Sequence, residues 1–154
     1  MPQSSPDDAI DYLPSPDHPG WHLWQMRNPG HFNDLYGDVL LRTNADGTAR
    51  VRIYPKPHLT NADGNIHGGA LMGFVDICLF AGPYQLGVGA AMGAVTVDAQ
   101  VQFVGAADLG APVDALVEIV RETGGFVFTR GLVVQQDRPI LSFTGLIKKR
   151  RSRS

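Results

Sequence analysis

The sequence predicts an α+β fold in which an antiparallel β-sheet wraps around one long central α-helix. Two strand-like segments precede a single apolar helical run, and four more follow it. Strands grouped on either side of one helix favour antiparallel pairing over the regular alternation of parallel α/β folds. With 154 residues, 44% of them hydrophobic, the chain is long enough for one such domain with a substantial core.

The first two strands are predicted to form a hairpin within residues 36–55. Apolar segments at 39–41 and 51–54 flank residues 44–47, which include the Asn, Asp and Gly that tolerate the left-handed backbone of a tight turn. Pro55 is expected to end the second strand, because proline has no N–H to donate to the sheet.

The central helix is predicted over residues 66–81, where apolar side chains point in nearly every direction. This pattern is typical of a helix that is buried on all sides. Gly82 and Pro83 are expected to bend or end it. Asp76 is the only charged residue in the run, and a buried carboxylate is costly unless partners hold it. Because free backbone N–H groups also gather at a helix entrance, where His67 is followed by two glycines, we expect a functional site on this helix.

The second half of the chain is predicted to be all strand. Residues 95–103 alternate apolar and polar side chains with the period of two of a half-buried strand, and Thr96 lies on the polar face. Three further strands are expected at 113–121, 126–135 and 139–149, with hairpin turns between them. A second subunit is expected to close what the curled sheet leaves open around the helix.

The two ends of the chain are predicted to lie outside this domain, which spans residues 35–149. Residues 1–34 form an N-terminal arm, partly disordered or docked as a cap, because they begin rich in Pro, Ser and Asp. Trp21 and Trp24 indicate that part of the arm packs onto the body as a short helix or lid. Residues 150–154 form a basic C-terminal tail.

Charge and composition exclude several classes of function. The formal net charge is −2, but residues 148–153 hold five of the 13 basic residues, which leaves 8 against 15 acidic ones elsewhere. That distribution argues against a nucleic-acid partner, whose basic surface would spread over one face. No apolar run is a convincing membrane span. A single cysteine excludes an internal disulfide framework and suits a reducing compartment, and no signal peptide is visible, so a cytoplasmic location is expected.

One segment resembles the signature of a known family. Asp76 follows His67 by nine positions, Asn61 precedes it by six, and the segment reads Asn61-Ala62-Asp63-Gly64-Asn65-Ile66-His67-Gly68-Gly69-Ala70. Together with residues 95–98 and 101–103 this resembles the hotdog-fold acyl-CoA thioesterases, and most closely the phenylacetyl-CoA (PaaI-type) group. The resemblance runs from about residue 35 to residue 149.

The resemblance implies a hotdog fold, edge-to-edge dimers that often pair into tetramers, and an active site shared across the dimer interface. The implied reaction is hydrolysis of an acyl-CoA to a free acid and coenzyme A, without a cofactor or metal. The apolar side chains along the helix point to aryl or medium-chain acyl groups.

The resemblance also implies a role for each site residue. Asp76 of one subunit is the general base or the nucleophile, and it faces Gly68 and Asn61 of the other. Gly68 gives its backbone N–H to the thioester oxygen, and Asn61 positions the water or the acyl group. His67 fixes the loop or contacts the carbonyl, and Thr96 holds a hydroxyl near the water.

Elementary chemistry agrees with these roles. The first turn of a helix offers unpaired N–H donors and a positive dipole end, both suited to a developing oxyanion. Asp76 lies about 12 Å further along the same helix at 1.5 Å per residue, so one carbonyl cannot contact both ends. Two antiparallel helices resolve this distance, which is an independent reason to expect a dimer.

Four further residues are expected to bind the substrate. Gly69 permits close approach to the backbone, Met72 and Phe74 line the acyl site, and Arg130 is a candidate for the phosphates of coenzyme A. Cys78 is expected to be structural, because apolar surroundings make a thiol inert.

Plainer interpretations stay open for the main site residues. Asp76 could pair structurally at an interface, Asn61 could be a turn residue, and Thr96 could be an ordinary exposed threonine. His67 could make only a structural hydrogen bond, and the two glycines could serve close packing alone. A non-catalytic acyl-CoA-binding module and an acyl-thioester hydratase or dehydratase are the alternative functions.

Overall fold

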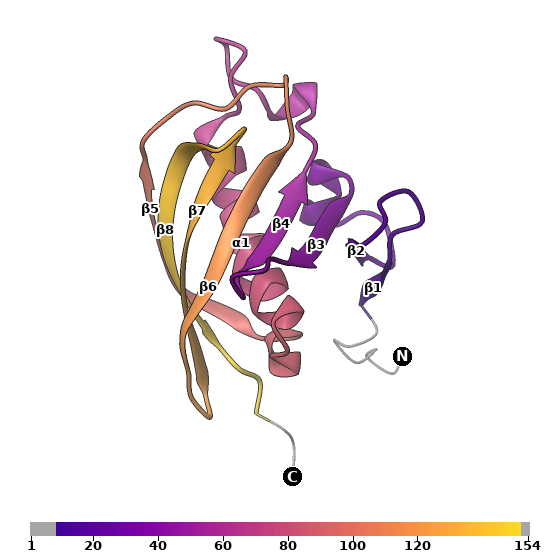
Figure 1. Cartoon of the computed structure of the whole chain (residues 1–154), viewed down its shortest axis with the longest axis vertical. Coiled ribbons are helices and arrows are strands. Elements are labelled where there is room, and N and C mark those ends of the chain that lie inside the picture. The colour runs from indigo at the N-terminus through magenta and orange to yellow at the C-terminus, as the bar shows by residue number, and fades with distance from the viewer. Residues whose placement is uncertain (1–8, 152–154) are drawn as a thin grey trace.

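The computed structural model describes residues 9–151, which form an antiparallel sheet curled around one long helix (Figure 1). The predicted α+β class is confirmed. Within the described residues the helix is α1 (Gly68–Gln85), and short 3₁₀ turns are η2 (Phe32–Tyr36), η3 (Pro57–Leu59) and η4 (Gly89–Ala91). The eight strands are β1 (Ile10–Pro14), β2 (His22–Met26), β3 (Val39–Thr43), β4 (Ala49–Ile53), β5 (Val95–Phe103), β6 (Val113–Glu122), β7 (Phe126–Gln135) and β8 (Arg138–Lys148).

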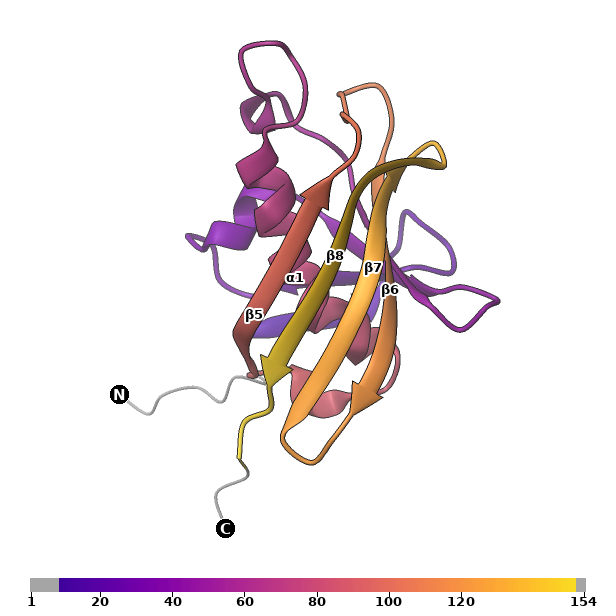
Figure 2. The same cartoon turned by 90° about the vertical axis from the view of Figure 1, so that its left-hand side faces the viewer.

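The strands lie in one sheet in the order β1-β2-β3-β4-β6-β7-β8-β5. The hairpin predicted within 36–55 is present as β3 and β4, and Gly47 has the positive φ of +87° that its tight turn requires. The four later strands agree with the predicted ranges to within one residue at most ends. The first of them, β5, is placed at the free edge of the sheet, beside β8 (Figure 2).

The N-terminal arm differs from the short helix or lid that the sequence suggested. Residues 10–14 and 22–26 form the strands β1 and β2, which extend the sheet beyond β3. Trp24 is only 3% exposed and belongs to the main core. The guanidinium groups of Arg42 and Arg52 both lie over the ring of Trp21, at 4.6 and 4.9 Å from its centroid. Residues 1–8 of the predicted arm and residues 152–154 of the predicted basic tail lie outside the described residues.

The helix is longer at its C-terminal end than predicted. Gly82 and Pro83 do not end it, because α1 continues to Gln85 with Pro83 in its last turn. A proline there removes one hydrogen bond only, and the following turn is closed by the Leu86 N–H, which donates to the carbonyls of Gly82 and Pro83. No helix in the described part of the chain is both long and apolar enough to cross a membrane.

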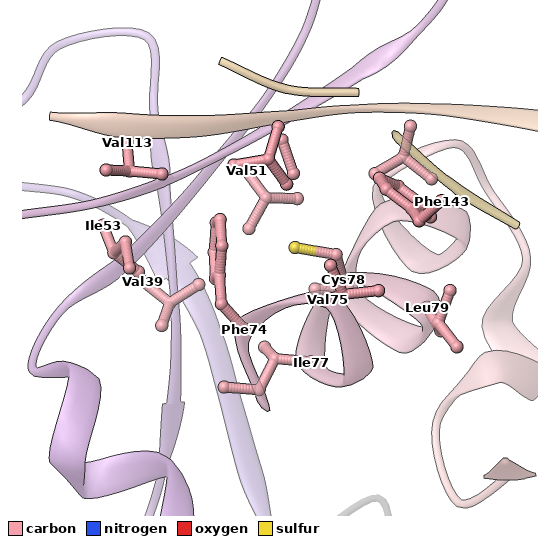
Figure 3. Packing of buried hydrophobic residues seen from close by; sticks show 14 of the residues in the cluster. Val39, Val51, Ile53, Phe74, Val75, Ile77, Cys78, Leu79, Val113 and Phe143 are labelled. Carbon is pink, nitrogen blue, oxygen red and sulfur yellow. The ribbon is translucent and has the colours of Figure 1, made fainter. Parts of the chain in front are cut away.

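The core lies between α1 and the concave face of the sheet. Phe74, Cys78 and Leu79 of the helix are fully buried against strand residues that include Val51 and Phe143 (Figure 3). The helix packs closely against the sheet at glycine positions: a Cβ atom at Gly82 would lie 2.7–2.9 Å from the side chain of Val117 on β6. The absence of a side chain at this position therefore sets how tightly the sheet closes on the helix.

We predict that Gly82→Ala destabilises the fold. The added methyl would meet the stiff, β-branched side chain of Val117, and overpacking of this kind costs about 1–3 kcal/mol. Urea unfolding followed by circular dichroism measures the loss. The matched control is Gly124→Ala, in a turn where a Cβ has no atom within 4 Å; equal stabilities of the two variants would contradict this account of the helix–sheet contact.

Candidate functional site

Asp76 lies at the surface of the single chain, and this corrects the expectation of a carboxylate buried on all sides. One stripe of α1 is left uncovered by the sheet, and it contains Gly69, Met72 and Asp76, with Met72 51% exposed. These positions are three and four residues apart, so they share one face of the helix. The helix is apolar all round, yet the sheet of one chain covers only part of it.

Thr96 is the direct partner of Asp76. Its hydroxyl donates a hydrogen bond of 2.6 Å to Asp76 Oδ1, which leaves Oδ2 unoccupied by this contact. The alternation of the sequence predicts Thr96 on the polar face of its strand, and this is wrong. A β-bulge between Thr96 and Asp98 inserts one extra residue, so the alternation is shifted at this point. On the helix-facing side Thr96 pairs with Ile147 and Ala99 pairs with Gly145, so the extra residue turns Thr96 towards α1.

The N-terminus of α1 is capped by His67. The Gly69 N–H donates to His67 Nδ1 at 2.8 Å, so the neutral ring carries its proton on Nε2. The backbone of the same loop is fixed as well, since the His67 N–H donates to the Leu59 carbonyl at 2.7 Å. The Gly68 N–H has no acceptor among residues 9–151, and it is therefore the donor next to this cap that a ligand can use.

Asn61 shapes the loop that leads into the helix. Its side-chain oxygen accepts from the N–H groups of Asp63 and Asn65, at 3.0 and 3.1 Å. The side-chain oxygen of Asn61 therefore stabilises the turn, as the plainer interpretation of this residue predicts. Its amide nitrogen has no acceptor within the described chain, and the side chain is exposed at the same end of the molecule as Gly68.

The two halves of the predicted site are not close within one chain. Gly68 and Asp76 lie on one uninterrupted helix, about 12 Å apart along its axis. The structure brings Asn61, His67, Gly68 and Gly69 together at the helix entrance, and Asp76 with Thr96 two turns further on.

Two of the predicted substrate-binding residues lie elsewhere. Phe74 is fully buried in the core, on the sheet-facing side of α1, and does not reach the surface stripe. Arg130 lies on the outer face of the sheet, where its guanidinium pairs with Glu118 at 3.0 Å. This pairing raises the pKa of Arg130 and lowers that of Glu118. The strand alternation puts Arg130 and the helix on opposite sides of the sheet, so the structure does not bring this residue to the site.

A cavity of about 240 Å³ opens beside the helix entrance, and it was not among the predicted features of the site. His67 and Gly69 form one wall, and Phe32, Leu35 and Tyr36 of η2 form another. The Tyr36 hydroxyl donates 2.6 Å to the Ala70 carbonyl in the first turn of α1. Burial, and then the neighbouring Cys78 and Asp76, raises the pKa of Tyr36 to about 12, so this hydroxyl stays protonated. Gly73, over which Phe32 and Tyr36 lie, was the only signal of this contact in the sequence.

Cys78 is not a candidate nucleophile for this site. Cys78 is fully buried, and burial raises the pKa of its thiol well above the usual range, which keeps it protonated and inert. Residues 9–151 contain no group of three or more His, Cys, Asp or Glu side chains that could hold a metal ion.

The chain belongs to the thioesterase superfamily, whose family model matches residues 63–141. The match covers the helix entrance, Asp76 and Thr96, and it confirms the resemblance stated above. A comparison with curated proteins gave no match.

Solved structures confirm the hotdog fold. The BH2602 protein of Bacillus halodurans, crystallised with CoA, has a TM-score of 0.68 and 22% identity over 82% of this chain and 83% of its own. A hypothetical thioesterase of Streptococcus pneumoniae TIGR4, with coenzyme A, has a TM-score of 0.66 and 20% identity over 79% and 92%. The PaaI protein of the E. coli phenylacetic acid degradation operon has a TM-score of 0.65 and 16% identity over 78% and 84%.

Proposed function

We propose that the protein is an acyl-CoA thioesterase that hydrolyses an aryl- or medium-chain acyl-CoA to the free acid and coenzyme A. The observation that carries this proposal is that α1 presents two different functional groups, one at its N-terminus and one two turns further on. One end offers the unpaired Gly68 N–H, and two turns away Thr96 orients a solvent-accessible carboxylate. Two structural neighbours that contain coenzyme A support the substrate class.

The proposed chemistry uses both ends of the helix. The thioester oxygen accepts from the Gly68 N–H, where the positive end of the helix dipole stabilises the oxyanion of the tetrahedral intermediate. Thr96 binds Asp76 Oδ1, which leaves Oδ2 for one of two roles. Oδ2 either takes a proton from a water whose oxygen attacks the carbonyl carbon, or attacks that carbon itself. Collapse of the intermediate breaks the carbon–sulfur bond, and coenzyme A leaves as a thiolate that takes up a proton. With water as the nucleophile this step gives the free acid directly. With Asp76 as the nucleophile it gives an acyl–Asp76 anhydride, which a water then hydrolyses to the free acid and the restored carboxylate.

The proposed site is completed by a second copy of the chain. Strand β5 has a free edge nine residues long, with Val95 58% and Val97 52% exposed, and it lies directly beside the uncovered stripe of α1 (Figure 2). A long edge strand with exposed valines of this kind favours pairing with another strand. Pairing of β5 with β5 in a homodimer would set two helices side by side and bring Asp76 of one chain to Gly68 and Asn61 of the other. Two such dimers would form the proposed homotetramer.

The proposal predicts that Asp76→Asn abolishes turnover while the fold survives. The amide keeps the size and can still accept from Thr96, but it is neither a base nor a nucleophile, so kcat should fall by about 10²–10⁴-fold. Free-thiol release from phenylacetyl, hydroxybenzoyl and straight-chain acyl-CoA measures this on both proteins. Retention of most activity by Asp76→Asn would exclude its role, and tight binding of an acyl-CoA with no thiol release by either protein would favour a binding module.

Gly68→Pro tests the oxyanion donor. Gly68 is the first residue of α1, a position where proline suits the helix, so the substitution removes the N–H with little effect on the fold. We expect kcat to fall by about 10²–10³-fold, as for other oxyanion donors. Gly68→Ala is the matched control, because it keeps the N–H and its Cβ would meet the Phe103 ring at an ordinary 3.4 Å. Equal activities of the two variants would rule out this donor.

Mixed dimers test whether the site is shared. Asp76→Asn and Gly68→Pro are each expected to be inactive alone. Unfolding and refolding them together at equal amounts should restore about a quarter of wild-type activity, because half the dimers are mixed and each has one intact site. Each variant refolded alone is the control. Recovery of no activity from the mixture would place the whole site within one chain.

A further inference from the structure

We propose that the cavity between η2 and the first turn of α1 holds the acyl group, and that Phe32 limits its length. The substrates would then be thioesters of uncharged acyl groups about the size of one aromatic ring with a short linker. This inference rests on the proposed function. It assigns the acyl specificity mainly to residues 32–36, which precede the matched family region of residues 63–141.

The cavity lies next to the proposed oxyanion site. His67 and Gly69, the two neighbours of Gly68, line its wall. A thioester whose oxygen meets the Gly68 N–H can therefore place one of its two ends in this cavity. We assign the acyl part to the cavity and the coenzyme A part to the solvent side. The other walls are largely apolar, with Leu35, Tyr36 and Leu59, which suits an acyl group and not a polar nucleotide.

The length of the cavity along the helix is set by two aromatic rings. A Cβ atom at Gly73 would lie 3.0 Å from the Phe32 ring, and closer still to the Tyr36 hydroxyl, so both side chains cover this glycine. Gly73 is one turn beyond Gly69, about 6 Å along the axis. An acyl chain that enters beside Gly69 and follows the helix therefore meets these rings after a single turn.

The volume of the cavity agrees with a small acyl group. At about 240 Å³ it exceeds the roughly 150 Å³ of an engineered apolar cavity that binds benzene, so one ring and a short linker fit. No Asp, Glu, Lys or Arg lines it, and His58, one of its two histidines, is in contact with the Leu35 carbonyl at 2.6 Å. A charged acyl end would lose its hydration there without gaining a partner.

Phe32 and Tyr36 differ in what their removal would do. Tyr36 is 1% exposed and holds the Ala70 carbonyl, so its loss would disturb the helix entrance. Phe32 is 60% exposed, and its truncation should lengthen the cavity without unfolding the chain. Phe126 on β7 is an exposed phenylalanine remote from the cavity, and Phe126→Ala is therefore the matched control.

The test compares kcat/KM for phenylacetyl-CoA, decanoyl-CoA, glutaryl-CoA and acetyl-CoA by free-thiol release. Wild type should favour the phenylacetyl thioester and discriminate against glutaryl-CoA. Phe32→Ala should raise the decanoyl-to-phenylacetyl ratio at least about 10-fold, the size of effect that a few methylenes produce in an apolar pocket. Leu35→Trp, which fills the cavity, should lower phenylacetyl-CoA turnover and spare acetyl-CoA. Phe126→Ala should keep the wild-type profile.

The outcomes separate this inference from the function on which it rests. An active wild type whose acyl preference is unchanged by Phe32→Ala and Leu35→Trp would overturn the acyl cavity and leave the thioesterase in place. A wild type that releases thiol from none of the panel would overturn both. A shift in Phe126→Ala equal to that in Phe32→Ala would also overturn the role of the cavity, because the effect would not be local.

Discussion

Burial of α1 in the concave face of the sheet is the constraint on which the rest of the structure depends. The helix has no polar face of its own, so it must be covered, and the sheet curls around it as far as one chain allows. Close packing at positions such as Gly82 brings the strands onto it. What remains uncovered is a single stripe, and the carboxylate and the glycines of the candidate site lie on that stripe or at its beginning.

Hydrogen bonding at the helix entrance holds the neighbours of the Gly68 N–H and leaves this donor free. Four N–H groups at a helix start lack partners within the helix. His67 takes the second of them, from Gly69, and leaves that of Gly68 free. Tyr36 holds the same turn from the other side through the Ala70 carbonyl. A position that must present its backbone to a ligand is thus held by neighbours on both sides, which is what a preorganised oxyanion site requires.

The regular elements and the residue types of the site could be predicted from the sequence, because period and turn chemistry are local. The wrong predictions concern residues whose orientation or burial is determined by tertiary contacts. The alternation in residues 95–103 continues unbroken through the bulge, so nothing local showed that Thr96 turns towards Asp76. Phe74 was assigned to the substrate because it lies on the same helix, but the direction in which the sheet approaches buries it. The proline-rich composition of the first 20 residues concealed the β1–β2 hairpin, whose strands are only five residues long.

The two edges of the sheet differ in a way that bears on how large an assembly can grow. The β1 edge is short, ends at Pro14, and carries the ion pair of Asp11 with Arg27, all of which discourage addition of another strand. The β5 edge is nine residues long, and Val95, Val97 and Phe103 are exposed on it. Contact between two β5 edges uses the same surface on both copies, so it is self-complementary and leaves only the two protected β1 edges outward. In the proposed homodimer, extension of the sheet would therefore stop at two chains, and the same edge that pairs the two copies would not support growth of a fibre.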